Sequence, residues 1–211
     1  MTMSSMFLFG SRARGDHDSG SDTDLLIVCD ERQPRHVSVG KVSMFFYLWQ
    51  KLLADAALGD LFAGHIALEG KPISDEFDQL GELRRAFKLR SSYAAEVSHA
   101  LDLGWFITRF PEELKPSLVT KRMIWCVRTI LISRSAEAGK PIFAPGQLAT
   151  TARSSAGQEL LSTRRRRKLT KSMLSLFERF LLEEGHVGDE LRYLTPTQFI
   201  DRFVESAKRL R

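Results

Sequence analysis

The chain of 211 residues is poor in cysteine and has no long apolar stretches. Its two cysteines, Cys29 and Cys126, lie inside apolar segments, so we expect buried, reduced thiols rather than a disulfide scaffold or a cysteine metal site. No apolar run reaches 18 residues, and a membrane span is therefore not expected. The first residues lack a basic region followed by an apolar core, so no signal peptide is expected. These features predict a cytoplasmic protein without a membrane partner.

Two common nucleotide-binding motifs are also missing. The sequence contains no GxGxxG and no GK[ST] after a glycine-rich loop, which argues against a Rossmann or a P-loop site. Charge is divided unevenly, because residues 1–80 hold 7 Lys/Arg against 12 Asp/Glu, whereas residues 81–211 hold 24 against 14. The acidic part suits a metal site, and the basic part could attract nucleic acid, a triphosphate or an acidic protein.

The most informative segment is residues 10–24, GSRARGDHDSGSDTD, which lies between two apolar runs. The run before it, residues 6–9, predicts a buried strand. Gly10 would let the backbone turn sharply and approach a ligand closely. Gly15 could end a short helical turn in the left-handed conformation.

The three polar residues after Gly10 are candidates for binding an anion. Ser11 is a good helix N-cap, and Arg12 and Arg14 would fall in the first helical turn. Free N–H groups and a partial positive charge at a helix N-terminus favour phosphate, and the two arginines add positive charge. We therefore predict that Gly10, Ser11, Arg12 and Arg14 bind the phosphates of a nucleotide.

A pair of aspartates, Asp22 and Asp24, starts the second apolar run. In an extended chain, residues two apart lie on the same face. Two carboxylates so close repel by about 1 kcal/mol in water and about 4 kcal/mol near a protein surface, a cost that a hard cation removes. Mg²⁺ suits one or two carboxylates together with substrate phosphates, and Mn²⁺ is the alternative ion. The pair predicts catalytic metal ligands for phosphoryl or nucleotidyl transfer.

Together these residues resemble the signature of the polymerase-beta-type nucleotidyltransferase superfamily: Gly-Ser, ten residues, Asp-x-Asp and an apolar run. The segment GSRARG…SDTDLLIV is similar to small bacterial minimal nucleotidyltransferases, and a weaker likeness to an LF-x-x-H-L-x-x-EG stretch continues through residues 60–75. The resemblance implies a mixed sheet with helices and transfer of NMP from an NTP to a hydroxyl. It also implies that Gly10 and Ser11 hold the triphosphate and that Asp22 and Asp24 bind the metals.

The resemblance further implies a third carboxylate, on a later strand, that acts as a base or a metal ligand. The expected strand is Val42–Tyr47, and Ser43 stands where the acid is expected. No Asp or Glu lies between Glu31 and Asp55. This leaves open a second hypothesis, a catalytically weak or inactive protein of the same fold that acts as an antitoxin of a toxin–antitoxin pair or as another regulatory partner.

The sequence pattern predicts short strands and helices in residues 1–76 and helices in residues 77–211. Together with the resemblance it implies an α+β fold, with a small mixed-sheet domain in residues 1–76 and an α-helical bundle in residues 77–211. Helices are expected over residues 49–57, 61–68, 77–87, 93–110, 118–135, 147–165, 168–184 and from 196 onward. The later part resembles the bundles that follow nucleotidyltransferase domains and help to bind the acceptor.

The nature of the acceptor is open: a protein side chain, a tRNA end or a small molecule. The basic run Arg164–Lys168 could be a solvated helix end or an RNA contact. Arg122, Arg128 and Arg134 are six residues apart and do not share one helix face, so we expect them on the surface. A basic nucleic-acid-binding protein and a helical ribonuclease with an Arg179 and His186 pair are further hypotheses.

Overall fold

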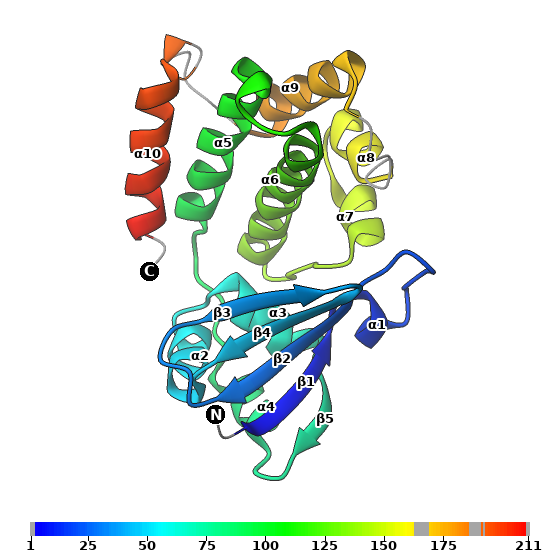
Figure 1. Cartoon of the computed structure of the whole chain (residues 1–211), viewed down its shortest axis with the longest axis vertical. Coiled ribbons are helices and arrows are strands. Elements are labelled where there is room, and N and C mark those ends of the chain that lie inside the picture. The colour runs from blue at the N-terminus through cyan, green and yellow to red at the C-terminus, as the bar shows by residue number, and fades with distance from the viewer. Residues whose placement is uncertain (1–2, 163–168, 186–190, 192, 210–211) are drawn as a thin grey trace. The chain divides into compact units, whose positions relative to one another are not determined.

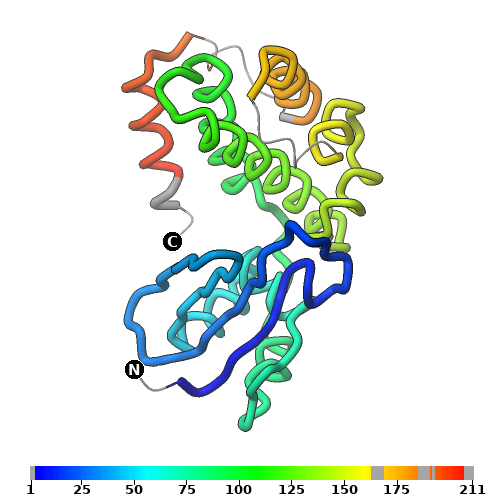
Figure 2. The backbone as a smooth tube through the Cα atoms, turned by 45° about the vertical axis from the view of Figure 1, so that its right-hand side comes forward, coloured from blue at the N-terminus to red at the C-terminus, as the bar shows by residue number. Residues whose placement is uncertain are grey.

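The computed structural model describes residues 3–162, 169–185, 191 and 193–209. The chain forms two compact units, residues 1–90 and residues 91–211 (Figure 2). The first unit contains the sheet, and the second is helical. The basic run Arg164–Lys168 lies outside the described residues, as does His186, so the RNA contact and the ribonuclease pair stay predictions.

A mixed sheet with the strand order β3-β4-β2-β1-β5 forms the first unit (Figure 1). Strands β2 and β4 run parallel, and the other neighbouring pairs run antiparallel. Strands β3 and β4 form a hairpin through the two-residue turn Gly40-Lys41, where Gly40 has φ +59°. The strands are β1 (Met3–Phe9), β2 (Thr23–Cys29), β3 (Arg35–Val39), β4 (Val42–Tyr47) and β5 (Lys71–Asp75).

Helices of the first unit cover one face of this sheet (Figure 1). They are α2 (Trp49–Ala57), α3 (Leu61–Glu69) and α4 (Gln79–Ala86), and the five-residue helix α1 (Gly10–Arg14) joins β1 to the following loop. Because side chains alternate along a strand, Phe7 and Phe9 of β1 and Leu26 and Val28 of β2 all point into this core. The core therefore fixes the ends of β1 and β2, where the glycine–serine turn and the aspartates lie.

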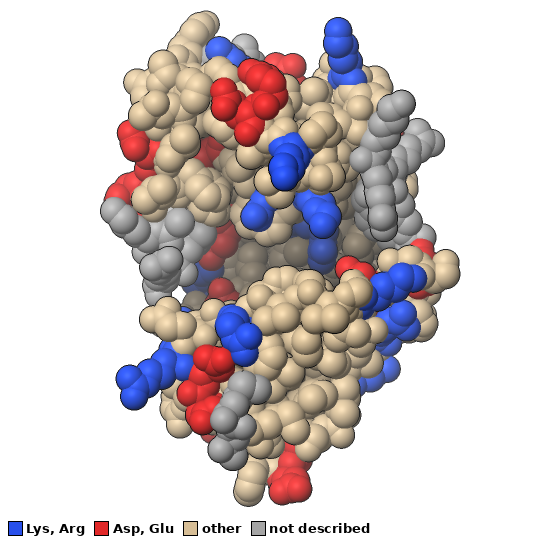
Figure 3. All heavy atoms as spheres, viewed as in Figure 1, with Lys and Arg blue, Asp and Glu red and all other residues tan. Residues whose placement is uncertain are grey.

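The opposite face of the sheet carries a smaller apolar cluster. Its buried members are Ile27, Cys29 and Phe46, with Met6, Val37 and Met44 packed against them. Figure 3 shows this face of the first unit as mostly uncharged. The guanidinium of Arg35 lies 4.3 Å above the Phe46 ring and covers part of it.

Asp75 determines where α4 begins. Its carboxylate accepts hydrogen bonds from the backbone N–H groups of Gln79 (2.7 Å) and Leu80 (3.0 Å). These bonds satisfy groups that a helix start leaves unpaired. Helix α4 packs against β5, α2 and α3, so the first structural unit extends to Arg90, whereas the expected domain division follows residue 76.

The second unit packs its longest helices, α5 and α6, against each other and against α9. Gly104 of α5 allows close approach, because a Cβ there would lie 2.9 Å from a methyl carbon of Leu181. In the described ranges, no helix combines the length and apolar character needed to cross a membrane. The helices are α5 (Ala94–Arg109), α6 (Pro116–Glu137), α7 (Pro145–Thr151), α8 (Ser155–Ser162), α9 (Lys171–Gly185) and α10 (Pro196–Arg209), with a short 3-10 turn η1 (Pro111–Glu113).

The expected α+β fold is confirmed, including Val42–Tyr47 as a strand and Trp49–Ala57 as a helix. The expectation of one helix over residues 147–165 is wrong, because the chain breaks between α7 and α8. There Ser154 accepts a hydrogen bond from the N–H of Gly157 (3.0 Å) and begins a new helix. Strands β3 and β5 were not expected.

Candidate functional site

Gly10 and Asp24 meet at the end of β1. In the antiparallel pairing of β1 with β2, Phe9 lies opposite Asp24, so the turn after Phe9 passes beside the Asp24 carboxylate. Gly10 has φ +72°, and a Cβ on it would lie 2.5 Å from Asp24 Oδ2. Glycine is required here for two reasons, the left-handed backbone and the space that the carboxylate fills.

Helix α1 follows this turn directly. Its N-cap is Phe9 rather than Ser11, which lies inside the helix, and the expected left-handed end at Gly15 is confirmed with φ +84°. Arg12 donates from Nη2 to the carbonyl oxygen of Ser21 (3.2 Å), and its Nε is buried without a hydrogen-bond partner among the described residues. A buried guanidinium N–H next to the turn is available to an anionic ligand.

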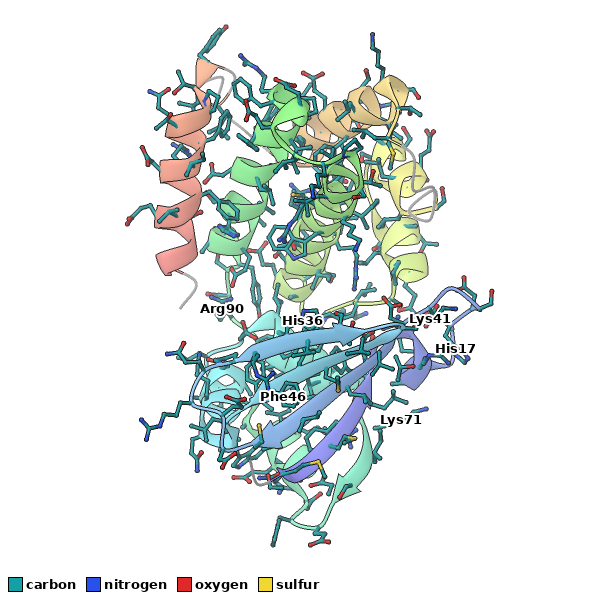
Figure 4. The ribbon with its side chains drawn as sticks, viewed as in Figure 1. His17, His36, Lys41, Phe46, Lys71 and Arg90 are labelled. Carbon is teal, nitrogen blue, oxygen red and sulfur yellow. The ribbon has the colours of Figure 1, made fainter. Side chains whose placement is uncertain are left out.

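The loop between α1 and β2 is held by its own side chains and by the β3–β4 hairpin. Asp18 Oδ1 accepts hydrogen bonds from Gly20 N (2.9 Å) and Ser21 Oγ (3.0 Å). Lys41 donates from Nζ to the carbonyl oxygen of Ser19 (2.7 Å), and Figure 4 shows Lys41 and His17 at this end of the sheet. The loop therefore brings Asp22 to the start of β2 along a defined path.

Asp22 and Asp24 differ in their surroundings. Asp22 is exposed and immediately precedes β2, whereas Asp24 is half-buried inside the strand. In the parallel pairing of β2 with β4, Asp24 lies beside Ser43, the position at which the family resemblance implies a third acid. A serine hydroxyl, not a carboxylate, is thus the neighbour of Asp24 on this side.

Residues 4–92 match the family model of the nucleotidyltransferase domain. This segment is similar to the nucleotidyltransferase domain family. The match covers all of the sheet except the first residue of β1, together with helices α1 to α4, and it confirms the resemblance drawn from residues 10–24. Among solved structures, the chain is similar to a nucleotidyltransferase-like protein from Exiguobacterium sibiricum 255-15, at 15% identity over 99% of this chain and 68% of that one, with a TM-score of 0.30. No curated protein gives a significant match.

Nucleotidyltransferase domains generally use divalent metal ions. In this domain the Asp24 carboxylate occupies the space that a Cβ of residue 10 would fill, and Asp22 lies two residues away. Such oxygen donors suit a hard cation. The described residues hold no group of three or more Asp, Glu, His or Cys side chains placed to bind a metal.

Arg14 is engaged with acidic partners. It donates from Nη1 to Glu69 Oε2 (2.5 Å) and lies 3.3 Å from Asp16. His65 Nε2 lies 2.9 Å from the same Glu69 oxygen, and the His65 ring packs edge-on against Phe9. These contacts join α1 to α3, so the structure places Arg14 as a link between helices.

The charge of Glu69 depends on this cluster. Burial raises the pKa of the Glu69 carboxyl, but hydrogen bonds and charge from His65 and Arg14 outweigh burial and lower its pKa overall. Glu69 therefore stays ionised at neutral pH and holds both partners. Sequence reasoning noted this stretch only as a weak family likeness, because a contact 55 residues apart has no local signal.

Proposed function

We propose that the nucleotidyltransferase domain binds an NTP with a divalent cation and transfers NMP to a hydroxyl of an acceptor. The contact between Gly10 and the Asp24 carboxylate carries this proposal. This contact places a turn that a phosphate can approach closely beside a carboxylate that suits a cation. The family that the domain resembles implies an NTP substrate.

Each residue of the site has a separate part in this proposal. Asp22 and Asp24 hold the cation, and Gly10 and Ser11 hold the β and γ phosphates. Arg12 contributes its buried Nε and its positive charge. Because Arg14 is paired with Glu69, its part is a supporting one. Arg14 orients α1 and adds positive potential near the phosphates.

The reaction is a displacement at the α-phosphorus. The acceptor oxygen forms a bond to phosphorus, the bond to the bridging oxygen breaks, and pyrophosphate leaves with that electron pair. A bound divalent cation would supply charge neutralisation and polarise the phosphate. The Gly10–Ser11 turn and Arg12 hold the triphosphate so that the α-phosphorus stays aligned with the attacking oxygen.

Transfer can be tested with labelled ATP, CTP, GTP and UTP, Mg²⁺ or Mn²⁺, and candidate protein, tRNA and small-molecule acceptors. We expect label on an acceptor, and loss of that label in Asp24→Asn. Loss of one charged ligand should weaken metal-dependent NTP binding by about 10–100-fold, the equivalent of roughly 1.5–3 kcal/mol. Glu76→Gln, which removes one negative charge in the loop between β5 and α4, is the matched control and should behave as wild type.

A second candidate function rests on Ser43, which stands beside Asp24 in place of an acid. In this alternative, the domain binds nucleotide without turnover and acts as an antitoxin or regulatory partner. NTP binding that depends on Asp24, with no label transferred to any acceptor, would favour this alternative. Failure of NTP binding would contradict both functions.

We also infer that the protein acts in the cytoplasm, since both cysteines are free and buried. The excess of Lys and Arg in residues 81–211 would favour an acidic acceptor such as RNA or an acidic partner protein. An RNA acceptor predicts affinity that falls steeply as the salt concentration rises.

A further inference from the structure

A row of polar side chains crosses three strands beside Asp24. Asp24 pairs with Ser43 of β4, and Ser43 pairs with Ser38 of β3. Ser43 Oγ lies 3.4 Å from Ser38 Oγ, and Ser38 Oγ lies 3.2 Å from His36 Nε2. Two hydrogen bonds therefore connect the neighbour of Asp24 to an exposed imidazole, which Figure 4 labels beside β3.

The imidazole of His36 is held in position by aromatic packing. It stacks on Phe45 with ring centroids 4.3 Å apart and an angle of 19° between the planes. Phe45 in turn packs against Phe9 and Phe62 at centroid distances of 5.5 and 5.3 Å. Because His36 and Phe45 are cross-strand partners, the ring lies on the same face of the sheet as Asp24.

Nucleotidyl transfer requires that the attacking hydroxyl lose its proton. In the proposed site, Asp22 and Asp24 serve the cation, and among the described residues no third acid joins them in a metal-binding group. Tyr47, two residues beyond Phe45, does not compete as a base, because burial, with Asp60 and Asp55 adding to it, raises its pKa to about 12. Along the polar row, the His36 imidazole is the group with a basic ring nitrogen, because Ser43 and Ser38 offer only hydroxyls.

We propose that Ser43, Ser38 and His36 form a proton relay that deprotonates the acceptor hydroxyl. The inference rests on the proposed function and adds the route of the proton. Ser43 is the catalytic residue that contacts the acceptor, and His36 acts through the two serines as the final proton acceptor.

In the transfer step, one phosphorus–oxygen bond forms, another breaks and three protons move. The acceptor oxygen bonds to the α-phosphorus while its proton passes to Ser43 Oγ. Ser43 gives its own proton to Ser38 Oγ, and Ser38 gives its proton to His36 Nε2. Pyrophosphate leaves with the electrons of the broken phosphorus–oxygen bond. Both serines end as hydroxyls and His36 as an imidazolium, so no additional reactant is needed.

Kinetics of the full chain test the relay. General-base catalysis contributes about 10²–10⁴-fold to a rate, so His36→Ala should lower kcat by at least about 100-fold and leave KM for the NTP within about twofold. Added imidazole should restore part of the lost rate in His36→Ala. Ser38→Ala should show the same loss, and Ser38→Thr, which keeps a hydroxyl, should recover at least about tenfold over it. Val39→Ala, at the exposed end of β3, is the control and should keep the wild-type rate.

A nitrogen-15 NMR spectrum of His36 tests the hydrogen bonds without turnover. The relay requires the neutral tautomer in which Nε2 accepts from Ser38, so the Nε2 resonance should move in Ser38→Ala. Equal rates of NMP transfer in the wild type and in His36→Ala would overturn the relay and leave the proposed function standing. An Nε2 resonance that does not move in Ser38→Ala would have the same meaning. A wild type that binds NTP and transfers nothing would overturn the transfer and the relay together.

Discussion

Replacing Gly10 with alanine tests the contact on which the proposed function depends. An L-residue at φ +72° costs about 1–2 kcal/mol in backbone conformation. The new methyl group would also lie 2.5 Å from Asp24 Oδ2, so the carboxylate must withdraw by about 1 Å to reach ordinary contact. We therefore expect both a loss of local stability and a displaced metal ligand.

Gly15 provides the matched control for the backbone cost. It has φ +84°, similar to Gly10, but a Cβ there would meet nothing within 4 Å. Gly15→Ala should therefore cost about 1–2 kcal/mol in backbone conformation and leave Asp24 in place. The difference between the two variants isolates the effect of moving the Asp24 carboxylate.

Two measurements on the full chain separate these effects. Hydrogen exchange of the β2 amides, followed by mass spectrometry, should show protection reduced by about 5–30-fold in both variants, the equivalent of one to two kcal/mol. Titration with NTP and Mg²⁺ should give binding weakened at least about tenfold in Gly10→Ala and little changed in Gly15→Ala. Equal nucleotide affinity in the two variants would refute the assignment of the Gly10–Asp24 contact to the binding site.

Three further substitutions have defined outcomes. Arg12→Lys removes the planar fork of donors and should weaken NTP binding by about tenfold in a titration, whereas unchanged affinity would exclude Arg12 from the site. Glu69→Gln should lower the unfolding free energy by about 1 kcal/mol at pH 7 through its bond to Arg14. Because the pKa of Glu69 is lowered on folding, this difference should be full above about pH 4.5 and vanish as pH falls through the folded pKa, and a pH-independent difference would contradict the ion pair. Glu184→Ala leaves Arg134 without its buried partner and should cost about 3–5 kcal/mol in denaturant unfolding, with a cost under 1 kcal/mol ruling out that pair as a stabilising contact.

The elements that sequence reasoning found have strong apolar patterns. Residues 23–29 and 42–47 are almost continuously apolar, and both are central or near-central strands. Helix α2 has two buried positions, Leu52 and Ala56, spaced four apart on one face. For such segments burial and periodicity agree, and the local pattern is enough to predict the element.

The missed strands are edge strands, where that pattern is weak. Most residues of β3 and β5 are exposed, so neither strand shows the nearly continuous apolar run of β2 and β4. Pro72 in β5 also argues against a strand, although proline is tolerated at an edge. A signal for β3 did exist in Gly40-Lys41, a two-residue turn with glycine first that is typical of hairpins.

Arginines on α6 show a different limit of sequence reasoning. Of the three arginines expected on the surface, Arg122 is exposed, whereas Arg128 and Arg134 are half-buried. Arg134 pairs with the buried carboxylate of Glu184. That carboxylate also accepts a hydrogen bond from the N–H of Ser154 (3.0 Å), where α8 begins. Both contacts join residues at least 30 apart, and helix periodicity carries no information about a partner on another element.

The polar row beside Asp24 depends on the register of the β3–β4 hairpin. A shift of one residue would turn Ser38 to the opposite face and break its bond to Ser43. Val37 prevents this shift, because it packs into the apolar cluster on the other face of the sheet, opposite Met44. The valine that faces away from the site thus determines that its neighbours His36 and Ser38 face toward it. A register shift would therefore change the packing of Val37 and the orientation of His36 and Ser38 together. A loss of packing at Val37 should disturb the site by moving strand β3, and not through any contact of Val37 with nucleotide.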